Sequence, residues 1–174
     1  GARDDAKAGD AVLITLADAV DIGRGQVLAH ASHPPSVGTR FEAEVVWMSS
    51  QPLVAGASLE FKFAHRYVAG SAARILHRVD VTDLGLHETV TLGLNDIGRC
   101  EFVLSEAVAF DSYEEHRPTG SFVIVDRFSR ATLGAGMVRS ASHGRLVAGP
   151  EQVTCAQRAA QKHQRPAVVW LNGL

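Results

Sequence analysis

Residues 117–137 read RPTGSFVIVDRFSRATLGAGM, two apolar runs joined by a short polar connection. Residues 122–125 are β-branched or aromatic and predict a strand, and residues 126–130 predict a turn. In the returning run, residues 131–138, two glycines alternate with apolar residues, which is typical of a strand that packs closely or coils sharply. The stretch therefore predicts the closing hairpin of an all-β core, covered on both faces as in a small closed barrel.

The composition is that of an ordinary globular protein. The 174 residues are 46% hydrophobic and 21% charged, which suits one well-filled core or two small domains. A net charge of -2, with both signs interspersed, argues against a broad nucleic-acid-binding surface. No apolar run reaches the ~20 residues that span a bilayer, and no signal-peptide pattern is evident. We therefore expect no nucleic-acid partner and no membrane partner.

The cysteines indicate the redox compartment of the protein, and the first residues indicate whether the chain is a fragment. Cys100 and Cys155 are far apart and lack ligand-like spacing, so they predict buried or incidental thiols in a reducing compartment, the cytoplasm. The chain starts without Met, in GARDDAKAGD. We expect a fragment that begins inside a domain.

Two short strands are expected before residue 31, at residues 11–16 and 26–30. The turn between them contains a Gly-x-Gly, but no helix pattern follows, so it does not predict a phosphate-binding loop. The adjacent Pro34 and Pro35 remove two backbone donors and force extended geometry. They mark the best domain boundary in the chain.

Beyond the prolines the hydrophobic period is two, which predicts a series of short strands. These strands are expected at residues 39–48, 59–63, 71–81, 92–97 and 99–104. Short strands with turn signals at this spacing indicate a barrel or a sandwich rather than βαβ units. Between residues 9 and 139 we find no long amphipathic helix pattern, so the predicted fold class is all-β.

One face of each predicted strand supplies the expected core. In residues 71–81 the alternation places Ala73 and Ile75 on the same face. The side chains expected to point inward in one closed or nearly closed barrel are Phe41, Val45, Trp47, Phe61, Phe63, Ile75, Phe102, Leu104, Phe122 and Ile124.

The composition changes after residue 139. Residues 140–152 are expected to form a linker, and Thr154 begins a capping-box pattern that predicts a helix ending before Pro166. Residues 167–171 then predict a buried strand. A helix, a strand and a terminal glycine are how an α/β nucleotide-binding domain begins.

No residue set makes a recognisable catalytic or metal site. The eight histidines include no pair at metal-motif spacing, and neither a Gly-x-Ser-x-Gly elbow nor a Cys/His nucleophile pair occurs. Asp80 with Asp83, or Asp111 with Asp126, could be paired carboxylates in space, although isolated aspartates at strand ends usually cap turns. We assign no catalytic residue and no metal ligand.

The loop at residues 112–119 is the richest in groups that make directional contacts. Tyr113 and Arg117 are of the types that most often anchor an interface, so they are the candidate partner-docking residues. Glu114 beside His116 could pose as acid and base, but a charge cluster in a loop is more typical of a solvated corner. For the whole loop the alternative is a solvated stretch with no partner.

A series of short motifs resembles one family. The motifs are Asp21-Ile22-Gly23-Arg24-Gly25, Val45-Val46-Trp47-Met48, Pro52-Leu53, Leu94-Asn95-Asp96-Ile97-Gly98, Phe110-Asp111-Ser112-Tyr113, Arg117-Pro118-Thr119-Gly120-Ser121-Phe122, Asp126-Arg127 and Ala135-Gly136-Met137. Their succession, over about residues 1–139, resembles the large subunit of bacterial sulfate adenylyltransferase, a relative of elongation factor Tu. Family members commonly carry Ser where this chain has Gly23, a change that bears on turn geometry.

The tail is similar to the start of adenylylsulfate kinase. The resemblance lies in Arg158-Ala159-Ala160 and in RPAVVWLNGL at residues 165–174. In that family the strand leads into a Thr-Gly-Leu-Ser-Gly-x-Gly-Lys-Ser loop, so the resemblance makes Gly173 the first glycine of a phosphate-cradling, cofactor-binding loop. Asn172 departs from the usual Thr.

The resemblance implies an elongation-factor-like domain order. Residues 1–31 would end a partial second β-barrel, and residues 32–139 would form a complete third barrel. Residues 140–152 would be a linker, and residues 153–174 the truncated helix–strand start of an α/β P-loop kinase domain.

The resemblance also implies what the parent protein does. Such an enzyme uses GTP, ATP and Mg²⁺: it makes adenylylsulfate from ATP and sulfate, coupled to GTP hydrolysis, and a fused kinase then phosphorylates the product. The implied partners of this segment are the small catalytic subunit and the GTPase domain of the same chain. The segment itself is expected to be inactive and to hold no cofactor.

Two other functions compete with this interpretation. A translation-factor-like barrel that binds RNA would need a basic, aromatic-bearing face, and the acidic net charge weighs against it. A free-standing, partner-binding barrel would have no use for a kinase-like tail.

Overall fold

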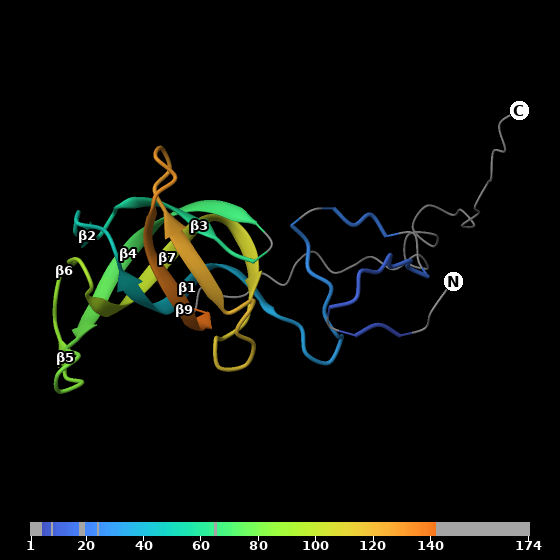
Figure 1. The fold of residues 1–174 in the computed structure, drawn as a ribbon, viewed down its shortest axis with the longest axis horizontal. Helices are drawn as coiled ribbons and strands as arrows, with labels where there is room; N and C mark the ends of the chain where they lie inside the picture. The colour runs from blue at the N-terminus through green and yellow to red at the C-terminus, as the bar shows by residue number, and fades with distance from the viewer. Residues whose placement is uncertain (1–4, 8, 18–19, 24, 65, 142–174) are drawn as a thin grey trace, which may run out of the picture.

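The computed structural model describes residues 5–7, 9–17, 20–23, 25–64 and 66–141 (Figure 1). Within these residues every regular element is a β-strand, which confirms the all-β prediction. The strands are β1 (Ser36–Trp47), β2 (Leu53–Val54), β3 (Ser58–Lys62), β4 (Tyr67–Val79), β5 (Leu86–His87), β6 (Thr91–Leu92), β7 (Ile97–Phe110), β8 (Ser121–Val125) and β9 (Thr132–Ala141).

The main sheet closes on itself as a barrel. Its strand order is β3-β8-β9-β1-β7-β4-β5, and β3 also pairs with β4, so every strand except β5 belongs to a closed ring of six. The first and last strands of the ring are neighbours, with Phe41 of β1 opposite Ala141 of β9. Closure leaves no open edge between the ring strands, and the small β2–β6 sheet is not paired with the ring but contributes Leu53 and Leu92 to the same core.

The core fills the barrel with aromatic rings. The ring of Phe41 lies 5.3–6.0 Å, centroid to centroid, from those of five other phenylalanines. All ten side chains expected to point inward are buried, with exposed fractions from 0% to 8%. Alternation therefore places these ten residues correctly, because successive side chains of a strand point to opposite faces.

Two glycines of β9 make room for this core. Gly134 and Gly136 are both buried. A Cβ on Gly136 would lie closer than 3.0 Å to the ring of Phe122, and one on Gly134 would meet the carbonyl oxygen of Val46 at 2.8 Å. The close packing predicted from the alternating glycines is therefore confirmed.

Two predictions within residues 71–97 were wrong. Ala72, not Ala73, is buried, because bulges shift the β4–β7 register between Ala72 and Arg74 and so change the face. Residues 92–97 do not form one strand: β6 ends at Leu92 and a turn follows, in which Asn95 has a φ of 66°. Asn in the left-handed region is typical of a tight turn.

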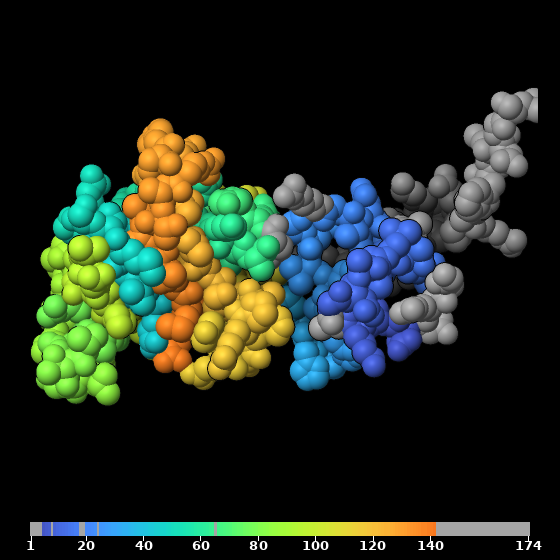
Figure 2. Space-filling model, in the orientation of Figure 1, coloured from blue at the N-terminus to red at the C-terminus, as the bar shows by residue number. Residues whose placement is uncertain are grey.

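The strands expected at residues 11–16 and 26–30 are also absent from the described residues before Ser36. This stretch pairs with no strand among the described residues, and Val12, Leu13 and Ile14 are 51%, 93% and 64% exposed. A strand needs a partner for its backbone hydrogen bonds, so a strand-like composition alone does not form one. Figure 2 shows this segment in blue at one end of the molecule, beside the barrel.

The predictions for the tail lie outside the described residues. They comprise the helix from Thr154, the strand at residues 167–171, the phosphate-loop residue Gly173 and all of the linker at residues 140–152 except its first two residues, which the structure places at the end of β9. No helix long and apolar enough to cross a membrane occurs in the part of the chain that the structure describes.

Candidate partner-docking site

The loop between β7 and β8 is built from consecutive turns. The backbone N–H of His116 donates to the carbonyl of Ser112 at 3.0 Å, and that of Gly120 donates to the carbonyl of His116 at 2.8 Å. Both ends of the loop are tied to β9, because the N–H of Tyr113 donates to Val138 and the N–H of Val138 donates to Gly120, each at 2.8 Å. The loop therefore has a defined shape.

Gly120 is required for this arrangement. A Cβ at residue 120 would lie 2.6 Å from backbone atoms of Tyr113, so a larger residue would push the two ends of the loop apart. The Gly that follows Pro118 and Thr119 in the sequence thus has a packing role.

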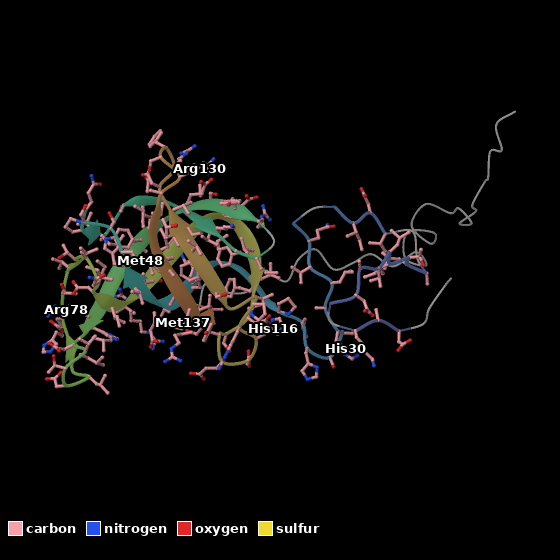
Figure 3. The ribbon with its side chains drawn as sticks, viewed as in Figure 1. His30, Met48, Arg78, His116, Arg130 and Met137 are labelled. Atoms are coloured by element: carbon pink, nitrogen blue, oxygen red, sulfur yellow. The ribbon has the colours of Figure 1, made fainter. Side chains whose placement is uncertain are left out.

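Polar contacts link the side chains of Asp111, His116 and Thr119 across the loop. The hydroxyl of Thr119 donates to Asp111, and Nδ1 of His116 lies 2.6 Å from the same hydroxyl. His116 Nδ1 is also 3.8 Å from the Asp111 carboxylate. His116, labelled in Figure 3, therefore helps to hold the loop together.

Glu114 belongs to a second network. It forms an ion pair with Arg139 of β9, whose guanidinium Nε also donates to Glu44 of β1 at 3.0 Å. The pKa of Arg139 is raised, chiefly because Glu44 accepts this hydrogen bond. Glu114 and His116 thus contact different partners rather than forming the acid–base pair considered from the sequence.

The two candidate docking residues lie together. The guanidinium carbon of Arg117 is 5.8 Å from the centroid of the Tyr113 ring, a distance typical of a cation–π contact. Tyr113 is half-buried and Arg117 is exposed. Arg117 makes no ion pair with any residue that the structure describes. Its charge is thus available to an outside group.

An apolar groove of about 510 Å³ begins at Tyr113. It crosses the outer face of β8, β9 and β1, where Pro118, Val123, Ala135 and Met137 supply much of its lining. The groove was not predicted, because it forms from residues on four strands, β3 included, and on two loops. The only signal for it in the sequence is the outward position of apolar residues such as Val123 and Met137.

Of the carboxylate pairs considered from the sequence, the structure brings together Asp80 and Asp83. One ligand atom from each, with one from His87, lies within 4.8 Å of the others. Local hydrogen bonds account for this: Asp80 accepts from the N–H of Thr82, and Asp83 from that of Gly85. The first bond is the main cause of the lowered pKa of Asp80. These are turn-capping aspartates.

Asp111 and Asp126 are not a pair, because they belong to different turns at opposite ends of β8. The thiol of Cys100 lies in the core, where burial raises its pKa to about 12. A thiol with so high a pKa is a poor nucleophile.

Curated relatives match most of this chain. It is 42% identical to the bifunctional enzyme NodQ of Azospirillum brasilense over 97% of its length, which is 28% of that protein. It is 43% identical to sulfate adenylyltransferase subunit 1 of Shewanella woodyi over 80% of its length, which is 30% of that protein. The bifunctional enzyme CysN/CysC of Xylella fastidiosa is 40% identical over 98% of this chain and 28% of its own. The chain thus spans less than a third of the length of these relatives.

The fold has solved counterparts. The structure of Sup35 complexed with GDP matches with a TM-score of 0.57 and 21% sequence identity, over 64% of this chain and 28% of that one, which shows the fold alone. The profile of the GTP-eEF1A C-terminal domain-like family matches residues 40–139, most of the closed barrel. The chain therefore belongs to the GTP-eEF1A C-terminal domain-like family, and its homologues include sulfate adenylyltransferase subunit 1 and the bifunctional CysN/CysC and NodQ enzymes.

Proposed function

We propose that this chain is the non-catalytic third-barrel segment of a cytoplasmic, bifunctional sulfate-activating enzyme. Its parent makes adenylylsulfate from ATP and sulfate, coupled to GTP hydrolysis, and then phosphorylates that product. The observation that carries the proposal is 40–43% identity to enzymes of these names over 80–98% of the chain. GTP, ATP and Mg²⁺ would bind to other parts of the parent.

The extent of the matches supports fusion to a kinase. The bifunctional relatives align over 97% and 98% of this chain, whereas the Shewanella subunit 1 aligns over 80%. The additional length agrees with a tail that belongs to the second enzyme. In this proposal Gly173 is the first glycine of the kinase phosphate loop.

The role of the barrel is to hold a partner through residues 112–119 and the adjacent groove. Tyr113 and Arg117 offer an aromatic ring and a free charge on a loop of fixed shape, and the groove offers apolar surface beside them. We take the occupant to be the small catalytic subunit, since a protein named subunit 1 has at least one further subunit. The GTPase domain of the same chain is the second partner.

The test uses the full-length protein with its small subunit. In the Tyr113→Ala/Arg117→Ala variant we expect affinity for the small subunit to fall by about tenfold or more, as for paired interface anchors. GTP-dependent adenylylsulfate synthesis should fall with it while the thermal midpoint stays unchanged. The matched control is Arg74→Ala, an exposed arginine of β4 outside the loop and the groove. Wild-type affinity and synthesis in the double variant would contradict the docking role.

A further inference from the structure

The turn between β8 and β9, residues 126–130, projects beyond the barrel (Figure 1). At its tip, Phe128 is 92% exposed. An aromatic ring held in water contributes nothing to the core, so it is available to a surface outside the barrel.

The backbone around Phe128 is fixed by one carboxylate. Oδ1 of Asp126 accepts hydrogen bonds from the N–H of Phe128 at 3.1 Å and from the N–H and hydroxyl of Ser129 at 2.6 and 2.7 Å. A loop that presents a side chain in one geometry loses less entropy on binding than a mobile loop does.

Backbone hydrogen bonds also fix the base of the turn. The N–H of Asp126 donates to Ala131 at 2.8 Å, and the N–H of Arg130 donates to Asp126 at 3.0 Å. Arg130, labelled in Figure 3, has a φ of 60° and pairs with Glu60 of β3. A non-glycine residue in the left-handed region needs such surrounding contacts.

Arg127 stands beside the exposed ring. It is exposed and makes no hydrogen bond or ion pair with any residue in the described ranges. Phenylalanine and arginine are both enriched at protein interfaces relative to the rest of the surface.

We propose that this tip, residues 126–130, inserts into an apolar, carboxylate-bearing pocket elsewhere in its own full-length polypeptide; the proposal rests on the proposed function. The small size of the tip favours a binding partner on the same polypeptide over a separate protein. A stable complex of separate proteins buries roughly 800 Å² on each side, far more than a five-residue turn offers. A partner on the same chain is present at millimolar effective concentration, so a small contact suffices.

The rest of the polypeptide is large enough to supply this pocket. The chain covers only 28–30% of the length of its bifunctional and subunit 1 relatives. The tip follows β8, whereas the docking loop precedes it, so the two surfaces lie at opposite ends of that strand and can be occupied together.

The experiment is site-specific photo-cross-linking in the full-length protein with its small subunit. p-Benzoylphenylalanine replaces Phe128, and the control places it at Leu84, an exposed position in the β4–β5 turn. We expect cross-links from residue 128 to peptides of the same polypeptide outside residues 1–174, several-fold above the control, with a yield independent of protein concentration. Asp126→Ala, which loosens the turn, and Arg127→Ala should each lower that yield several-fold.

Three outcomes would overturn the proposal: no yield above the Leu84 control, cross-links only to the small subunit or a second copy, or a yield that rises with protein concentration. Adenylylsulfate synthesis by the same full-length protein is measured in parallel. Synthesis without the intramolecular cross-link refutes the tip proposal alone, whereas absence of synthesis counts against the proposed function.

Discussion

At the scale of single residues, Gly136 shows how tightly the barrel is filled. Replacing it with Ala would push a methyl group into the Phe122 ring, so we expect Gly136→Ala to lower the free energy of unfolding by about 1–3 kcal/mol. Urea denaturation measures this. The control is Gly38→Ala in β1, where the nearest atom to an added Cβ is 3.9 Å away. Equal stability of the two variants would contradict this account of the packing.

Residue types alone were enough to single out Tyr113 and Arg117, and the structure places them in contact. The networks around them could not be predicted in the same way. Glu44 and Arg139 are 95 positions apart in sequence and meet only because β1 and β9 are neighbours. Side-chain partners across a barrel depend on strand order, which the local pattern does not contain.

At the scale of elements, the turn at residues 126–130 should lose stability at acid pH. Hydrogen bonds from the backbone and side chain of Ser129 lower the pKa of Asp126 below its ordinary value of 3.8. The stabilisation of the turn is therefore present above that ordinary value and is lost as the pH falls through the lowered one. NMR titration of the Phe128 and Ser129 amides should show this transition.

The control for that titration is Asp126→Asn, which keeps an oxygen acceptor but cannot titrate. Its two amides should show no transition at these pH values. If the wild-type amides titrate at or above the ordinary carboxyl pKa, the carboxylate does not organise the turn as described.

Regularly paired strands followed their sequence pattern, whereas a bulged strand and a segment without partners did not. The alternation in β1 and β7 predicted the buried faces correctly, and β4 departed from its pattern at a bulge. Residues 11–16 have a good strand composition yet form no ladder in the structure. Composition reports the preference of a segment, whereas a strand exists only when a second one is paired with it.

At the scale of the whole molecule, the aromatic core should dominate stability. Phe61 is fully buried and makes an edge-to-face contact with Phe102, with 5.1 Å between the ring centroids. We expect Phe61→Ala to cost about 3–5 kcal/mol in a denaturant titration, since a cavity remains. Val54→Ala, at a site 45% exposed, should change stability by about 0.5 kcal/mol or less. A small effect at Phe61 would mean that the core is loosely packed.

Protection from hydrogen exchange should differ between the N-terminal segment and the barrel. The amides of residues 12–16 are outside any ladder, whereas those of β8 pair with β3 and β9. We therefore expect residues 12–16 to exchange much faster than Phe122 and its neighbours, measured by NMR or mass spectrometry at neutral pH. Equal and strong protection would make the N-terminal segment an integral part of the main barrel.

The pairing of the first strand with the last has a consequence for biosynthesis. A ribosome releases β1 first, but β9, which fills the gap between β8 and β1, emerges last. At about 5–20 residues per second, the ~100 residues from β1 to β9 take roughly 5–20 s to make. Throughout that time one edge of β1 is open to other nascent chains, so of the six ring strands β1 keeps an unpaired edge for the longest.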